Sequence, residues 1–305
     1  MTQGQTSGVE YEDIDEVKRS GRGTPKFRLR NANVMQSPQG IFYTDYLDPV
    51  EQVEPTIVGD KLDTQAIEYI ERSLQSNNER FRQEIKTIQG LRDIRGARIL
   101  DIGCGGGKFL AMAKELGAEV TGLELEDSRA FYAKTVNGLD VRKRPIEDKA
   151  WQSEHHSYDI VTLWDVIEHV NYPYSTLKAA SQMLKPGGFL VIDTPCKDSF
   201  YHRFGQFTYA LTRGAYPTFL SIMYSSHLFG HKQIFSTKEI HMLVSGTGLS
   251  VRKVEKFHEL SFPLSYYLLK LTRSKVLARM AAPVAAIVFR FARIKNKMLV
   301  VAEAN

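Results

Sequence analysis

The chain has 305 residues, of which 43% are hydrophobic and 25% are charged, and its net charge is +5; this length can hold one large core with added segments. Two cysteines, Cys104 and Cys196, exclude a disulfide framework and fit a reducing compartment. No signal-peptide pattern opens the chain, and no apolar run reaches the roughly 18 residues that span a bilayer, so we expect a cytoplasmic protein.

The N-terminal third is predicted to be a cap in front of a separate core. Residues 1–30 are rich in Gly, Ser, Thr and Gln and are expected to form a disordered tail. Within the cap, residues 31–95, the segments 63–74 and 80–91 carry apolar residues at helical spacing. These apolar residues are Ile67, Ile70, Leu74, Phe81, Ile85 and Ile88.

A strand, a glycine turn and a helix are predicted at the start of the core, residues 96–198. The strand is residues 98–102 and contains Asp101, and the turn runs from Gly103 to a helix that begins at Lys108. Glycine accepts a positive φ and lets a ligand approach the backbone, and a helix N-terminus offers free N–H groups. The pattern predicts a nucleotide-binding α/β unit.

The next strand, residues 118–123, ends at Glu124, which follows Gly103 by 124 − 103 = 21 residues. An acidic residue at this spacing meets ribose hydroxyls in a doubly wound sheet. A nicotinamide-binding turn would carry glycine where Lys108 stands. The turn is therefore expected to bind another cofactor that contains ribose.

A third group of elements follows: a strand at residues 158–163, a helix near 175–184 and a strand at 189–193. The first strand leads into Asp-Val-Ile-Glu-His-Val from Asp165, and Leu-Lys-Pro-Gly-Gly begins at Leu184. With the glycine turn, this order resembles the class I S-adenosylmethionine-dependent methyltransferases, in the branch of ubiquinone-biosynthesis and of natural-product and sugar O-methyltransferases. The resemblance covers residues 80–195.

The resemblance implies an α/β, doubly wound (Rossmann-like) fold with a seven-stranded, mostly parallel sheet, N-terminal helices that close over the site and an inserted helical lid. It implies S-adenosylmethionine as cofactor, S-adenosylhomocysteine as product and methyl transfer to a hydroxyl of a small-molecule acceptor. Transfer to nitrogen or carbon, and a non-catalytic, membrane-docked cofactor-binding protein, are the alternatives.

The resemblance also indicates the residues around the cofactor. Asp101 and the glycines are expected at the methionine part, Glu124 at the ribose, Ile146 and Glu147 at the adenine, and Arg82 at the carboxylate. The full expected set is Asp101, Gly103, Cys104, Gly105, Glu124, Leu125, Ile146, Glu147, Leu163, Trp164 and Arg82.

Asp165, Glu168 and His169 form Asp-x-x-Glu-His, and on a helical turn their side chains would share one face. The favoured interpretation is that Glu168 and His169 orient the loop by hydrogen bonds. The alternative, which the resemblance to metal-dependent relatives implies although Asp stands where Glu is usual, is that the three residues hold a divalent metal that lowers the pKa of an acceptor hydroxyl. His169, His227 and His231 are the candidate catalytic residues, because histidine titrates near neutral pH.

Residues 199–235 are rich in Phe and Tyr and are predicted to be a lid. In residues 236–305 the core resumes with a helix at 237–246, capped by Ser236 and Glu239, and with strands at 249–254 and 298–302. The typical core of the family has a short hairpin between these two strands, whereas about forty residues intervene here.

This insertion, residues 260–297, carries eight lysines and arginines and no acidic residue among many apolar ones. The favoured interpretation is a pair of lid helices packed on the core, or a homodimer contact. The alternative is docking on an anionic membrane surface, which would place the protein peripherally at the inner membrane face. We expect no nucleic acid, because no recognised binding motif is present.

Overall fold

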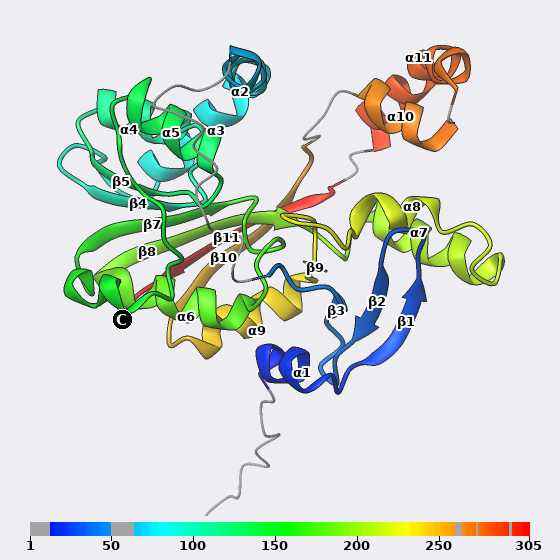
Figure 1. Cartoon of the computed structure of the whole chain (residues 1–305), viewed down its shortest axis with the longest axis horizontal. Helices are drawn as coiled ribbons and strands as arrows, with labels where there is room; N and C mark the ends of the chain where they lie inside the picture. Colours follow the sequence, from blue (N-terminus) through cyan, green and yellow to red (C-terminus); the bar gives the residue numbers. More distant parts are fainter. Residues whose placement is uncertain (1–12, 50–63, 260–263, 273, 293–294) are drawn as a thin grey trace, which may run out of the picture.

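The computed structural model describes residues 13–49, 64–259, 264–272, 274–292 and 295–305. Its central sheet has seven strands in the order β10-β11-β8-β7-β4-β5-β6 (Figure 1), and β11 alone runs antiparallel to its neighbours. The doubly wound fold predicted from the sequence is thereby confirmed. The strands are β4 (Arg98–Ile102), β5 (Glu119–Leu123), β6 (Asp140–Arg142), β7 (Tyr158–Trp164), β8 (Leu184–Pro195), β10 (Ser250–Phe257) and β11 (Lys297–Glu303).

Helices cover both faces of this sheet, and alternation along each strand sorts the side chains between the two layers. Ile99 packs with α3 (Asn78–Gln89), α4 (Lys108–Glu115) and α5 (Asp127–Thr135), whereas Leu100 packs with α6 (Pro173–Met183) and α9 (Thr237–Gly246). The capping box predicted at Ser236 and Glu239 begins α9. A 3-10 helix (Lys149–Glu154) precedes β7.

The helix α2 (Thr64–Ser76) packs against the glycine turn. A Cβ atom added to Gly106 would lie 3.1 Å from both Ile70 Cγ2 and Leu74 Cδ1 of this helix. Two of the three apolar residues that predicted the helix therefore face the turn.

The expected N-terminal tail and cap differ from the structure. Residues 1–12 lie outside the described residues, but α1 (Ile14–Ser20) and β1 (Thr24–Arg28) occupy most of the remaining tail. With β2 (Asn33–Gln36), β3 (Phe42–Thr44) and β9 (Gln233–Ile234), β1 forms a second, antiparallel sheet. The disordered tail is thus wrong from residue 13 onward, and the cap is helical only in α2 and α3. Such short strands depend on distant partners: Phe42 pairs with Ile234.

The segment predicted to be a lid, residues 199–235, contains α7 (Phe200–Leu211) and α8 (Thr218–Met223), which pack together beside the small sheet (Figure 1). Leu220 and Tyr224 of the lid share a buried cluster with Phe27 and Phe42. The Arg28 backbone N–H also donates to the Tyr209 hydroxyl at 2.9 Å. The lid and the N-terminal segment therefore form one layer that stabilises both.

The insertion between β10 and β11 forms a helical hairpin of α10 (Leu264–Thr272) and α11 (Lys275–Ala292). Among the helices of the described ranges, none is both long and apolar enough to cross a lipid bilayer.

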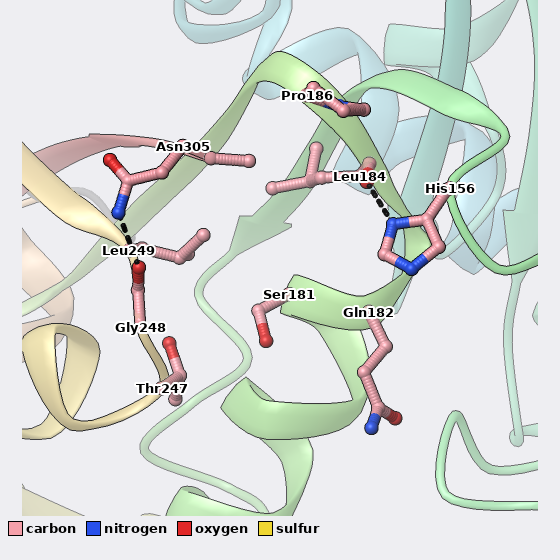
Figure 2. A pocket seen from close by; sticks show the side chains of 10 residues that line it. His156, Ser181, Gln182, Leu184, Pro186, Thr247, Gly248, Leu249 and Asn305 are labelled. Atoms are coloured by element: carbon pink, nitrogen blue, oxygen red, sulfur yellow. Dashed lines mark hydrogen bonds between the residues drawn. The ribbon is translucent and has the colours of Figure 1, made fainter.

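A hollow of about 270 Å³ opens where β8 begins and β11 ends (Figure 2). Its lining includes His156, Ser181, Gln182, Thr247 and Asn305, and His156 Nδ1 bonds to the Leu184 carbonyl at 3.0 Å. Doubly wound sheets bind ligands at the opposite, carboxyl edge of the strands. The hollow is therefore separate from the candidate site.

Candidate functional site

The glycine turn after β4 has positive φ at Gly103, Gly105 and Gly107. A Cβ atom at Gly103 would lie 2.5 Å from Val166 Cγ2, and one at Gly107 would lie 2.4 Å from Leu139 Cδ1. A Cβ at Gly105 would meet no atom within 4 Å. Packing thus requires the first and last of these glycines, whereas the backbone at Gly105 borders open space.

Glu124 lies beside this turn at the end of β5 and is buried. Its Oε2 accepts a hydrogen bond from the Gly105 N–H and its Oε1 accepts one from the Glu126 N–H, both at 2.8 Å. Burial raises the pKa of Glu124. The Cys104 thiol is buried as well, and burial raises its pKa, so the backbone of this residue, and not its sulfur, is available to a ligand.

Asp101 is buried at the end of β4, next to the same turn. Its Oδ1 accepts a hydrogen bond from the Thr162 hydroxyl at 2.7 Å. Burial raises the pKa of Asp101 to about 7. A ligand cation near this carboxyl would favour its ionised form.

The other residues expected at the cofactor follow the carboxyl ends of neighbouring strands. Ile146 is buried in the core, Leu125 is partly buried against it, and the exposed Glu147 accepts a hydrogen bond from the Thr176 hydroxyl of α6.

Leu163 and Trp164 end β7. Leu163 is fully buried, and the Trp164 ring packs edge-to-face on Phe109 at 5.6 Å. Within the described residues, the buried indole N–H of Trp164 has no hydrogen-bond partner.

The structure does not support Arg82 as a carboxylate ligand. Its exposed side chain pairs with Glu79 on the same helix, at 3.4 Å. Arg80, two residues earlier, instead points inward and pairs with Asp165 at 2.6 Å and Glu84 at 2.8 Å. Both arginines lie on one short stretch of polar residues, and the sequence pattern alone does not separate them.

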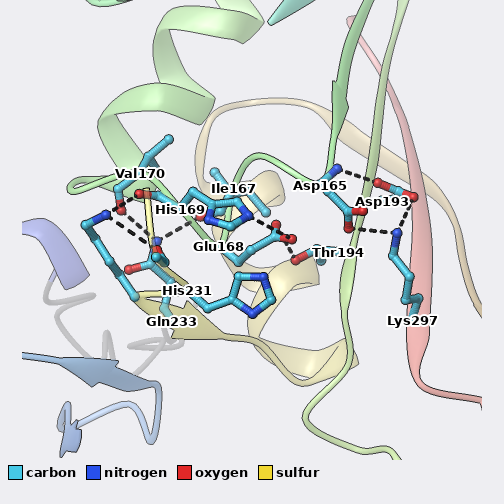
Figure 3. Close-up of polar contacts among 12 residues, drawn as sticks. Asp165, Ile167, Glu168, His169, Val170, Asp193, Thr194, His231, Gln233 and Lys297 are labelled. Carbon is cyan, nitrogen blue, oxygen red and sulfur yellow. Dashed lines mark hydrogen bonds and ion pairs between the residues drawn. The ribbon is translucent and has the colours of Figure 1, made fainter. Parts of the chain in front are cut away.

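A buried ion cluster occupies the carboxyl edge of the sheet, and Figure 3 shows part of it. The Lys297 ammonium lies 2.7 Å from Asp165 and 2.8 Å from both Asp193 and Glu259. Burial opposes ionisation of Asp165, but Lys297 and Arg80 hold its pKa well below the usual range. Lys297 is thus an internal cation, although its sequence neighbourhood suggested a surface charge.

The metal set predicted from Asp-x-x-Glu-His is wrong at Asp165. This residue has a φ of 53°, so the segment is no helical turn at that point, and its carboxylate is held by Lys297 and Arg80. Glu168, His169 and His231 converge instead, with one ligand atom from each lying within 4.8 Å of the others. In the described part of the chain, Glu168 Oε1 and His169 Nδ1 are buried without a hydrogen-bond partner.

His231 joins this group because its own segment binds the loop after β7. Lys232 donates through its Nζ to the His169 carbonyl, and Gln233 donates to the carbonyls of Ile167 and Val170, all at 2.8 Å. The rings of His169 and His231 are 4.6 Å apart (Figure 3). No sequence pattern pointed to Lys232 and Gln233 as positioning residues.

His231 has a defined tautomer. Its Nδ1 lies 3.2 Å from the Met223 carbonyl, and because a carbonyl only accepts, Nδ1 must carry the hydrogen. Nε2 of the neutral ring is then an acceptor. His227 is exposed, and its Nδ1 bonds to the Leu228 carbonyl, so the structure does not bring it into the cluster.

Comparison with known proteins agrees with this geometry. A family described as a methyltransferase domain matches residues 68–254. A chain of the solved complex between the Haloferax volcanii Trm112 methyltransferase activator and a methyltransferase is similar in fold, with a TM-score of 0.55 at 15% identity over 80% of this chain and 99% of that one.

Curated relatives named ubiquinone biosynthesis O-methyltransferase are also similar. The protein from Nitrosospira multiformis is 39% identical over 106 residues, which are 33% of this chain and 44% of the relative. The protein from Vibrio atlanticus is 30% identical over 168 residues, which are 53% of this chain and 67% of the relative. The match thus spans less than half the length of the first of these relatives.

Proposed function

The chain belongs to the S-adenosylmethionine-dependent methyltransferases, and from this premise we propose that it methylates a hydroxyl oxygen of a small acceptor. The observation that carries the proposal is the fixed tautomer of His231, which belongs to the cluster with Glu168 and His169 and whose Nε2 is left as an acceptor. An alcohol or phenol must lose a proton when it is methylated, whereas an amine can attack through its lone pair. A positioned base therefore favours oxygen as the acceptor atom.

The cofactor fits the edge formed by β4, β5 and β7. When bound, S-adenosylmethionine supplies a methyl group on a sulfonium, which is a good leaving group. Glu124 is placed to accept hydrogen bonds from the ribose hydroxyls, and Asp101 to pair with the amino group. The open space at Gly105 lets the ligand reach the backbone between them. Such charge-assisted hydrogen bonds contribute about 1.5–3 kcal/mol each.

The surroundings of His231 keep the base uncharged. Burial lowers the pKa of His231, and burial together with His231 lowers the pKa of His169 to about 3. Burial and Asp165 raise the pKa of Glu168 well above its usual range. His231 Nε2 can therefore take the proton from the hydroxyl of the methyl acceptor. The Met223 carbonyl then stabilises the resulting imidazolium through its hydrogen bond with Nδ1–H.

A divalent metal also fits Glu168, His169 and His231, because two buried donor atoms of this group lack a partner among the described residues. A metal held there would lower the pKa of an acceptor hydroxyl. Activation by a metal and activation by the His231 base would occur at the same site. A chelator distinguishes them, because it would abolish activity only if a metal is required.

The test is methyl transfer from labelled cofactor to paired acceptors that differ only in carrying a hydroxyl or an amine, with products identified by mass spectrometry. We expect O-methyl products, and we expect His231→Asn to lower kcat by about 10²–10⁴-fold while S-adenosylhomocysteine still binds. His227→Asn is the matched control and should change kcat little. N-methyl products made equally well by His231→Asn would refute the assignment.

A further inference from the structure

Two long segments of the chain contain no acidic residue. No aspartate or glutamate occurs between Asp198 and Glu239, or between Glu259 and Glu303. The first segment is the lid with α7 and α8, and the second contains the α10–α11 hairpin. The family match ends at residue 254, so the hairpin is an addition whose role membership in the family does not define.

Both segments leave the central sheet at the edge that carries the site. β8 ends at Pro195 and β11 begins at Lys297, and these two residues are partners in the sheet register. In Figure 1, α7 and α8 lie on the same side of the molecule as α10 and α11, and α8 contacts α10. A surface on these helices is therefore adjacent to the site edge.

The outer face of α11 is strongly apolar and open to solvent. We call this the docking face, and its members each expose more than half of their surface: Val276, Leu277, Met280, Val284 and Ile287. From Leu277 onward their spacing is three to four residues, and Val276 lies four residues before Met280, which places all five along one side of the helix. Ala278, by contrast, is buried, as is Leu268 of α10. The hairpin thus buries one side of α11 and leaves an apolar side uncovered.

A second apolar stripe follows α7. Phe200, Phe207 and Leu211 each expose more than half of their surface, and Phe204 lies between them at helical spacing. Arg203 and Arg213 are exposed around this stripe. The same combination of apolar and basic side chains is therefore present in both acid-free segments.

The charges around the docking face indicate which kind of partner it binds. Lys275 and Arg279 are exposed on α11, and no acidic residue of the segment balances them. A second copy of the same face would bring like charges together, which opposes self-association. Apolar side chains bordered by lysine and arginine suit an anionic bilayer, where the apolar groups enter the headgroup region and the cations meet lipid phosphates.

We propose that the α10–α11 hairpin docks the protein peripherally on an anionic lipid bilayer through the docking face. Docking in this way would bring the site edge close to the membrane surface. The inference does not depend on the proposed acceptor, and its test does not measure methyl transfer.

The experiment is co-sedimentation of the full chain with vesicles of phosphatidylcholine alone or mixed with phosphatidylglycerol, at low and high salt. Two double variants probe the face: Met280→Ser/Val284→Ser removes apolar groups, and Lys275→Glu/Arg279→Glu reverses charge. The matched control, Lys134→Glu/Val136→Ser, makes the same kinds of change at exposed residues near the end of α5. Circular dichroism and thermal melting verify that every variant is folded.

We expect binding that needs phosphatidylglycerol and weakens with salt. Each face variant should partition about tenfold more weakly or worse, and the control should bind like the parent. Absence of binding by the parent, or equal binding by the face variants, would overturn the proposal. A face that is instead covered by a second copy would appear as concentration-dependent dimers in sedimentation velocity, disrupted by Met280→Ser/Val284→Ser, and this would also overturn it.

Discussion

Replacing Lys297 with methionine tests whether the buried ion cluster stabilises the fold. The substitution keeps a similar volume and removes the cation that contacts Asp165, Asp193 and Glu259. Burial raises the pKa of Glu84 to about 8, so at pH 7 this carboxyl is mostly protonated. Three carboxylates then face two cations, and the variant leaves them with Arg80 alone.

The magnitude follows from the distances. At 2.8 Å and an effective dielectric constant of about 20, each contact with Lys297 corresponds to about 6 kcal/mol of Coulomb attraction. The cost of removing the ammonium from water and its repulsion by Arg80 offset much of this sum. Removing one member of a buried ion cluster typically costs about 3–5 kcal/mol, and we expect the free energy of unfolding to fall by that amount at pH 7.

The cost should depend on pH in a definite direction. Burial opposes the charged form of Lys297, but Asp165 and Asp193 outweigh it and raise the pKa of the lysine in the folded protein. The lysine therefore stays charged from pH 5 to 9, and its contribution is lost only above that range. Without it, the neighbouring carboxylates bind protons more readily. Each proton taken up by the folded variant recovers about 1.4 kcal/mol per pH unit, so the difference from the parent should shrink toward pH 5.

Urea denaturation followed by circular dichroism at pH 5 and pH 7 measures both effects. The matched control is Lys253→Met on β10, where an exposed pair with Glu255 should change the free energy of unfolding by no more than about 0.5 kcal/mol. A Lys297→Met variant that is as stable as this control, or whose deficit is equal at both pH values, would refute the reasoning.

Two further predictions concern the cofactor edge. Because the pKa of Asp101 is about 7 in the protein without ligand, affinity for S-adenosylhomocysteine in calorimetry should fall up to about tenfold per pH unit below 7, and Asp101→Asn should abolish this dependence. Gly107→Ala should lower the free energy of unfolding by about 2–4 kcal/mol, because it combines a φ of 78° with a contact at Leu139. Gly138→Ala, with positive φ and open space, should cost about 1 kcal/mol; equal losses would contradict the packing argument.

Local signals made much of the core predictable from the sequence. The strand at 98–102, the helix start at Lys108 and the capping box at Ser236 agree with the structure, because each depends on neighbouring residues. The small sheet was missed because β3 pairs with β9, and Phe42 meets Ile234 only after the whole core has intervened.

In the candidate site, too, contacts between residues far apart in the sequence were not predictable. The spacing of Asp165 and Glu168 predicts convergence only if the segment is helical, and the positive φ of Asp165 removes that condition. Its actual partners, Arg80 and Lys297, lie far away along the chain on α3 and β11. Sequence spacing reports helical neighbours but carries no information on a pairing that tertiary packing creates.

The hairpin insertion is proposed to bind the membrane, and its base adjoins the buried ion cluster. Removing the hairpin tests whether these two features are independent. Lys297 and Glu259 pair at 2.8 Å where the insertion meets the sheet, and Phe257 is the register partner of Lys297, so a short linker can join the two strands. Replacing residues 261–294 by a Gly-Ser linker should therefore keep the ion cluster, the melting temperature and S-adenosylhomocysteine binding, while vesicle binding is lost. If cofactor binding disappeared in the folded, shortened protein, the hairpin would have to be part of the site, and its assignment as a peripheral docking element would fail.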